Sequence, residues 1–157
     1  MMSSVALADG EELTVGELLG RRLKTYLVVL SACDTGIGQL TDGDDVMGFS
    51  RSLLAAGVKN IVVSLWPVHD LATSFLMKRF YEQLQKGQRV SAALREAQNV
   101  VKQLKPDEMD RYVVELRKEC GEDTFARSIA PEKENPWQHK VYSQPRFWAP
   151  FIFIGLR

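Results

Sequence analysis

Two short runs of apolar and β-branched residues constrain the fold of this chain more than any other feature. They are residues 26–32 (YLVVLSA) and residues 60–66 (NIVVSLW). Nearly continuous apolar runs of this length are typical of strands covered on both faces, as in a parallel sheet. Between them, residues 45–56 repeat apolar side chains at helical spacing, and Gly57 is a plausible C-terminal stop. The order strand, helix, strand predicts an α/β fold with right-handed crossovers.

The other predicted elements surround this unit. Thr14 and Glu17 have the spacing of a capping box and predict the start of a short helix. Asp70 stands where a helix N-cap is expected. The remaining expectations are two short strands around a turn at Asp9-Gly10, a helix after Asp70 with apolar positions from Ala72 to Leu84, helices over 90–104 and 109–116, and a last strand at 151–154.

Size and charge narrow the possible classes of function. The 157 residues are 45% hydrophobic, which is typical of one globular domain. Within this domain, we interpret residues 105–146 as a helix plus a polar surface insertion. Twenty basic residues balance twenty acidic ones, so bulk charge supports neither a nucleic-acid nor a membrane partner. We identify no zinc site among the two cysteines and two histidines, and we predict no cofactor. Without a signal peptide, the expected location is cytoplasmic.

The carboxyl ends of the two central strands are where chemistry is expected, because functional groups collect there in open parallel sheets. Cys33 follows the first run and precedes a glycine-containing loop, where backbone N–H groups can lower the pKa of a thiol. This position is therefore compatible with a nucleophile. It is equally compatible with a buried cysteine that packs as a small hydrophobic side chain. Cys120 follows a charged helix and has no such context. The glycines at 36 and 38 match no phosphate-binding motif.

Several segments, in order, resemble one family. Residues 27–36 (LVVLSACDTG) resemble the nucleophile segment of CHAT domains, which are caspase-like domains often joined to tetratricopeptide (TPR) repeats. The resemblance runs from about Leu7 to Gly155 and is interrupted over 105–146. Its other blocks are 48–57 (GFSRSLLAAG), 64–68 (SLWPV) with Asp70 and Thr73, Phe80-Tyr81, 93–98 (ALREAQ), and 148–151 (WAPF) with Gly155.

This resemblance implies a three-layer, parallel-sheet caspase-like fold, of which residues 1–157 form a partial domain, the C-terminal portion. It also implies a cysteine endopeptidase in which Cys33 attacks the peptide carbonyl and a histidine transfers the proton. In this clan the histidine lies roughly 50 residues upstream. Only 32 residues precede Cys33 here, none of them histidine, so we expect the isolated chain to be inactive. His69 and His139 are weaker candidates for this role.

Substrate binding follows from the same resemblance. Ser64, Leu65 and Trp66 would form the edge to which an extended peptide adds as a strand. Acidic residues near the presumed cleft favour Arg or Lys at the cleavage site, although a helix cap or a solvated turn explains the same residues. They are Asp34, Asp42, Asp44, Asp45 and Asp70.

Two alternatives remain open at this point. One is a CHAT-like protein-interaction module that has lost protease activity, with Cys33 buried. The other is a flavodoxin-like domain, which lacks a phosphate-binding loop and an acidic metal triad. The expected partners are a protein or peptide substrate and a TPR or other sensor region. Because a partial sheet leaves an apolar edge exposed, we also expect self-association.

Overall fold

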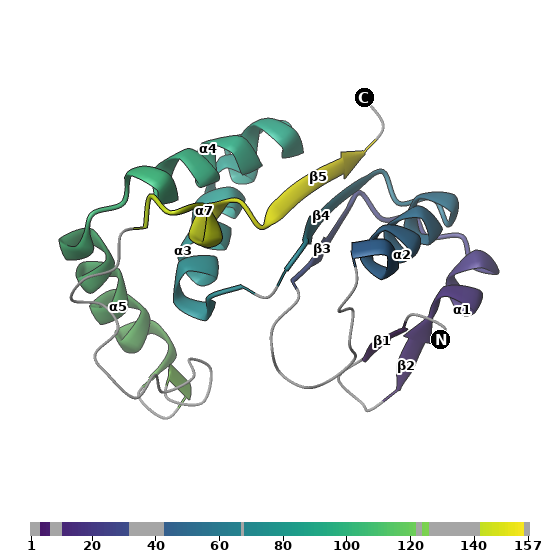
Figure 1. Ribbon diagram of the computed structural model, residues 1–157, viewed down its shortest axis with the longest axis horizontal. Coiled ribbons are helices and arrows are strands. Elements are labelled where there is room, and N and C mark those ends of the chain that lie inside the picture. The colour runs from purple at the N-terminus through teal and green to yellow at the C-terminus, as the bar shows by residue number, and fades with distance from the viewer. Residues whose placement is uncertain are drawn as a thin grey trace. The chain divides into compact units, whose positions relative to one another are not determined.

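The structure is a computed structural model that describes residues 4–6, 11–31, 43–66, 68–121, 124–125 and 142–155. The side chains of residues 4–6, 12 and 43–45 are not part of this description. The chain forms two compact units, one of residues 1–67 with 150–157 and one of residues 68–149. We describe each unit by itself (Figure 1).

The first unit is built on a three-stranded sheet with the order β3-β4-β5. Its strands are β3 (Leu27–Leu30), β4 (Asn60–Ser64) and β5 (Phe151–Gly155). Strands β3 and β4 are parallel, with Leu27 opposite Asn60 and Leu30 opposite Val63. Both predicted central strands and the last strand are therefore present.

The expectation of an all-parallel sheet is wrong, because β5 runs antiparallel to β4. The chain returns beside the carboxyl end of β4, where the Leu65 N–H donates to the Pro150 carbonyl at 3.0 Å. A strand that enters from that end must run back along β4. The fold is thus mixed α/β, and an antiparallel edge strand on a parallel pair is a common arrangement.

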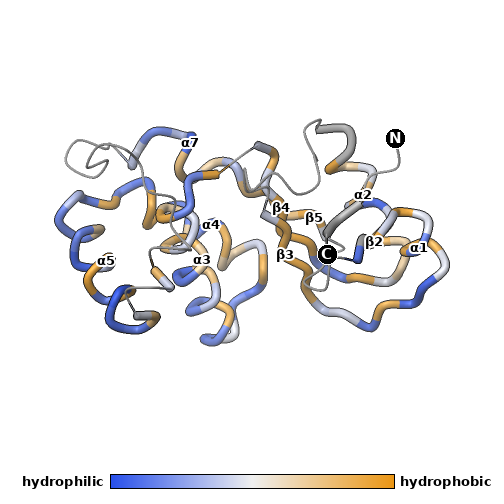
Figure 2. Tube along the Cα trace, turned by 90° about the horizontal axis from the view of Figure 1, so that it is seen from below, coloured by the Kyte–Doolittle hydropathy of each residue, from blue (hydrophilic) through white to orange (hydrophobic). Residues whose placement is uncertain are grey.

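The core of the first unit lies between the sheet and helix α2 (Gly43–Ala55). Strand β4 is buried along its whole length, whereas β3, at the edge of this sheet, is only half-buried. Figure 2 shows the strands as the hydrophobic part of this unit. The buried cluster consists of Leu18, Val46, Phe49, Leu53, Val58, Ile61 and Val63.

The predicted capping box at the N-terminal side of this unit is confirmed. Strands β1 (Ser4–Ala6) and β2 (Glu12–Thr14) pair antiparallel, and helix α1 (Val15–Leu19) follows. The Glu17 N–H donates to Thr14 Oγ1 at 3.2 Å, and the Thr14 N–H donates to Glu17 Oε2 at 2.9 Å. These bonds from Thr14 lower the pKa of the Glu17 carboxyl. The predicted turn at Asp9-Gly10 lies outside the described residues.

The second unit is helical, as predicted for this part of the chain. It contains α3 (Asp70–Gln85), α4 (Val90–Gln103), α5 (Pro106–Cys120) and the short α7 (Pro145–Trp148). Helices α3 and α4 pack on each other through buried apolar faces that include Phe80 and Val101. The Gln98 side chain donates to the Trp148 carbonyl at 3.0 Å and ties α4 to α7.

Candidate active site

The parallel pairing of β3 and β4 determines which residues meet at the carboxyl edge of the sheet. Leu30 lies opposite Val63, so the residues that follow, Ser31 and Ser64, leave neighbouring strands at the same end. Ser31 is exposed. Cys33 follows two residues later, but Cys33 and Asp34 lie outside the described residues, so their predicted roles remain predictions.

The segment that follows β4 on the predicted cleft is described by the structure for residues 64–66. Ser64 is fully buried and lies opposite Phe151 in β5. Because Leu65 makes the hydrogen bond to Pro150 on the β5 side, the main-chain groups of Ser64 face the β3 side. Trp66 is the exposed side chain of this segment, at 39%.

His69 caps α3, in place of the predicted Asp70. The Ala72 N–H donates to His69 Nδ1 at 3.3 Å, and Asp70 is the first residue of the helix. The prediction was displaced by one residue because an imidazole nitrogen occupies the acceptor position that an Asx or Ser oxygen usually fills. The His69 ring also meets the Phe147 ring edge-on, with centroids 5.5 Å apart.

The capping bond bears on the alternative in which His69 acts as a catalytic base. Nδ1 must be unprotonated to accept from Ala72, so a neutral ring carries its proton on Nε2. Nδ1, the nitrogen that would have to accept a proton, is therefore already used as the acceptor of the helix cap. His139, the other histidine, lies outside the described residues, as does Asp42.

Cys120 has a local structural role, in agreement with the sequence prediction. It is the last residue of α5, and its Sγ donates to the Leu116 carbonyl at 2.9 Å. The thiol is half-buried. A bond to the carbonyl one turn earlier needs no partner outside the helix.

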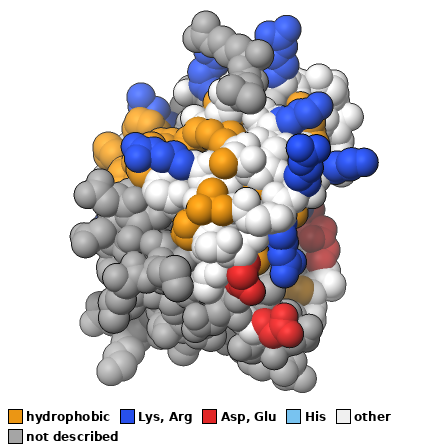
Figure 3. Space-filling view, turned by 90° about the vertical axis from the view of Figure 1, so that its right-hand side faces the viewer, with side chains coloured by type: hydrophobic (Ala, Val, Ile, Leu, Met, Phe, Trp, Pro, Cys, Tyr) orange, Lys and Arg blue, Asp and Glu red, His pale blue; other side chains and the backbone are white. Residues whose placement is uncertain are grey.

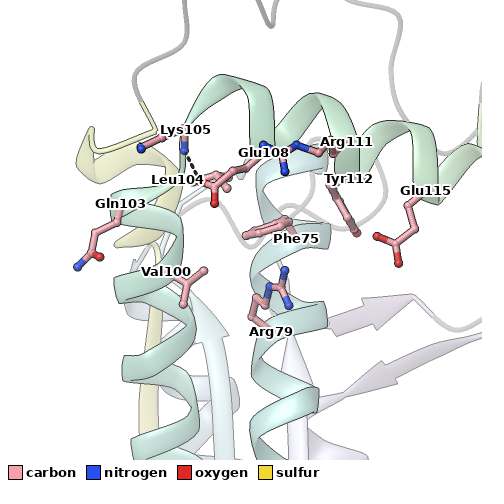
Figure 4. Close-up of a pocket in the computed structure, with 10 residues that line it drawn as sticks. All are labelled: Phe75, Arg79, Val100, Gln103, Leu104, Lys105, Glu108, Arg111, Tyr112 and Glu115. Carbon is pink, nitrogen blue, oxygen red and sulfur yellow. Dashed lines mark hydrogen bonds between the residues drawn. The ribbon is translucent and has the colours of Figure 1, made fainter.

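A cavity of about 450 Å³ lies among α3, α4 and α5 in the second unit (Figure 4). None of its lining side chains is a cysteine, histidine or serine, so it has no nucleophile of the kind that peptide hydrolysis needs. The lining residues are Phe75, Arg79, Val100, Gln103, Leu104, Lys105, Glu108, Arg111, Tyr112 and Glu115.

Contacts around this cavity instead hold α5 against α3. The Tyr112 hydroxyl donates to Ser74 Oγ at 3.1 Å, and burial raises the pKa of this hydroxyl. Lys78 Nζ donates to Glu115 Oε1 at 2.8 Å, which raises the pKa of Lys78 and lowers that of Glu115. We therefore interpret the cavity as part of the packing interface between the helices.

The described residues contain no cluster of three or more His, Cys, Asp or Glu side chains placed to hold a metal ion. Within the same residues, no helix is both long and apolar enough to cross a membrane.

The family comparison covers almost the whole chain: the sequence model of the CHAT domain matches residues 1–156. Two curated relatives are both tetratricopeptide repeat protein 28. The human protein is 39% identical over 143 residues, which is 91% of this chain, and the mouse protein is 40% identical over 93 residues, or 59% of this chain. This chain spans only 4% of the length of each.

Proposed function

Because the chain belongs to the CHAT domain family, a family of caspase-like domains, we propose that it is the nucleophile-bearing portion of a cysteine endopeptidase. Its fold would be the C-terminal portion of a three-layer caspase-like domain, with residues 105–146 as a helix plus insertion. The observation that carries the proposal is the parallel pairing of β3 and β4, since it brings Ser31 and Ser64 to the same edge of the sheet. Cys33 lies two residues beyond Ser31.

In the proposed reaction, the Cys33 thiolate attacks the carbonyl carbon of the scissile peptide bond. A C–S bond forms, the carbonyl electrons move to oxygen, and backbone N–H groups stabilise the oxyanion. The C–N bond then breaks as a histidinium protonates the leaving amine, and water hydrolyses the thioester. This histidine would come from outside these 157 residues, either from another segment of the same protein or from a partner. The engagement of His69 in the α3 cap supports that assignment.

The substrate would be an extended peptide that adds beside residues 64–66. The exposed Trp66 at the end of this segment would contact a substrate side chain. Asp34 and Asp70 would favour a basic residue at the cleavage site, because carboxylates attract Arg and Lys. Asp70 is half-exposed at the start of α3.

The test is a peptide-cleavage assay on the whole protein in which this chain occurs. Internally quenched peptides that differ only in Arg or Asp at the cleavage site are compared for the native protein, C33S and C120S. We expect arginyl peptides to be cut faster, C33S to be inactive, and C120S to retain full activity because the Cys120 thiol forms its hydrogen bond to Leu116 within α5. Activity that survives C33S would overturn the proposal, and faster cleavage of aspartyl peptides would overturn the basic preference.

A second candidate is a CHAT-like protein-interaction module without protease activity. The observation that favours it is that the one histidine among the described residues, His69, caps a helix. Such a module would bind the TPR region that accompanies CHAT domains in relatives such as tetratricopeptide repeat protein 28. Binding of a TPR region by a protein in which neither native chain nor C33S cleaves any peptide would favour this candidate.

A further inference from the structure

One surface of the first unit combines exposed cations with exposed apolar side chains. It lies where the chain enters β3 and β4, at the ends of these strands away from Ser31 and Ser64. We call it the basic end. It consists of Leu19, Arg21, Arg22, Lys24, Tyr26 and Lys59.

Main-chain hydrogen bonds join the two segments that make up the basic end. The Leu23 N–H donates to the Ala56 carbonyl at 2.6 Å, and the Lys59 N–H donates to the Thr25 carbonyl at 3.3 Å. The Asn60 side chain adds a bond to the Tyr26 carbonyl at 2.9 Å. Residues 21–26 and 56–60 therefore run side by side.

Gly57 makes this close approach possible. Its φ of +102° is a conformation that other residues rarely adopt, and a Cβ there would lie 3.0 Å from the Leu23 carbonyl oxygen. The basic end is thus presented on a fixed backbone rather than on a loose loop.

The charge of this surface is not balanced locally. All four cationic side chains are exposed, and within the described part of the chain none of them forms an ion pair. Arg21 lies near enough to Glu17 to help lower its pKa, but the Glu17 carboxylate is bonded to Thr14. The six residues of the basic end thus carry four cations and no carboxylate, while Asp and Glu side chains lie lower on the face that Figure 3 shows.

Two large apolar side chains that flank residues 21–25 in the chain are exposed as well. Leu19 is 63% and Tyr26 is 61% exposed, the highest values among the large hydrophobic side chains that the structure describes. Figure 3 shows Lys and Arg side chains gathered with hydrophobic ones on one face of the molecule. Tyrosine and arginine are the residue types that most often dominate protein interfaces.

We propose that the basic end binds an acidic peptide segment of a partner protein. Carboxylates of the segment would pair with the four cations, and an apolar side chain between them would cover Tyr26 and Leu19. Complementary charge supports this occupant, and an apolar side chain of the partner would cover the exposed apolar pair, which the phosphate backbone of a nucleic acid would not do.

The experiment measures binding of a fluorescein-labelled synthetic peptide that repeats the triplet Glu-Glu-Phe, by fluorescence anisotropy. Peptides that repeat Gln-Gln-Phe and Glu-Glu-Ser separate the charge from the apolar contribution. R21E/R22E and Y26S are compared with R89E/R95E, which makes the same change of charge at exposed positions of the second unit. Circular dichroism of each variant checks that it is folded.

We expect R21E/R22E to weaken binding of the Glu-Glu-Phe peptide by about tenfold or more, since several ion pairs are replaced by repulsion. The Y26S substitution and the Glu-Glu-Ser peptide should each weaken binding several-fold. R89E/R95E should leave the affinity for the Glu-Glu-Phe peptide nearly unchanged. Raising salt from about 0.1 M to about 1 M should weaken binding, because it shortens the screening length to about 3 Å.

Three results would overturn the proposal. One is equal binding by the native chain and folded R21E/R22E. Another is equal loss in R89E/R95E, which would indicate a response to total charge only. The third is tighter binding of a DNA duplex or of phosphatidylserine vesicles than of the Glu-Glu-Phe peptide, which would assign the surface to a different class of partner.

Discussion

At the scale of single residues, His69 has a structural role at the start of α3, where the sequence had also suggested it as a weaker candidate for the catalytic histidine. Its Nδ1 accepts the Ala72 N–H at the start of α3, and its ring packs on Phe147. A residue that stabilises the helix in this way is expected to matter for folding, whether or not the protein cleaves peptides.

The first prediction concerns this cap. H69A should lower the free energy of unfolding by about 1 kcal/mol, because it removes an N-cap acceptor. H69N should lower it less, since asparagine restores the acceptor and loses only the ring contact. Urea unfolding followed by circular dichroism measures both. If H69N is as destabilised as H69A, the cap contributes nothing; if folded H69N loses all cleavage activity, His69 is catalytic after all.

At the scale of elements, helix α5 is attached to α3 by both apolar and charged contacts. Tyr112 packs edge-on against Phe75, with centroids 5.0 Å apart, and Lys78 pairs with Glu115. These two side chains are 29% and 55% exposed, so the pair contributes modestly beside the aromatic contact.

The second prediction is the pH dependence of this ion pair. Lys78 lowers the pKa of Glu115 below 4.5, so the stabilisation is complete above that value and is lost as pH falls through the lowered pKa. Native protein should therefore exceed E115Q in Tm at about pH 7 and lose this advantage at about pH 3. E96Q, on the exposed side of α4, is the control. A difference between native protein and E115Q that does not change with pH would contradict the assignment.

The elements also show how much of the fold could be predicted from the sequence. Strands β3 and β4 and helix α2 were predictable because apolar periodicity reports burial directly. The direction of β5 was not, since the residues 151–155 read the same whichever end of β4 the chain approaches. The cap at His69 was missed because histidine is a rare N-cap. Cys33 and Asp34 lie outside the described residues, so their roles rest on the sequence alone.

At the scale of the whole molecule, β3 and β5 are the edge strands in the described part of the sheet, where each pairs only with β4. Strand β3 consists of Leu27, Val28, Val29 and Leu30. An apolar edge strand of this kind is a template for pairing with another chain.

The third prediction is that the isolated chain self-associates through this edge. Light scattering over a wide range of concentrations should show a mass that rises with concentration. V29K should reduce the association, because a lysine on an edge strand opposes pairing, whereas V114K, at an exposed position of α5, should not. A constant monomer mass for the native chain would contradict the prediction.

The central claim is that Cys33 is the nucleophile of a cysteine endopeptidase. The most direct measurement is to treat the whole protein with an arginyl acyloxymethyl ketone, which alkylates activated thiolates, and to locate the adduct by mass spectrometry. We expect an adduct on Cys33, none on Cys120, and loss of peptide cleavage in proportion to labelling. An unlabelled Cys33 in a protein that still cleaves peptides would contradict it.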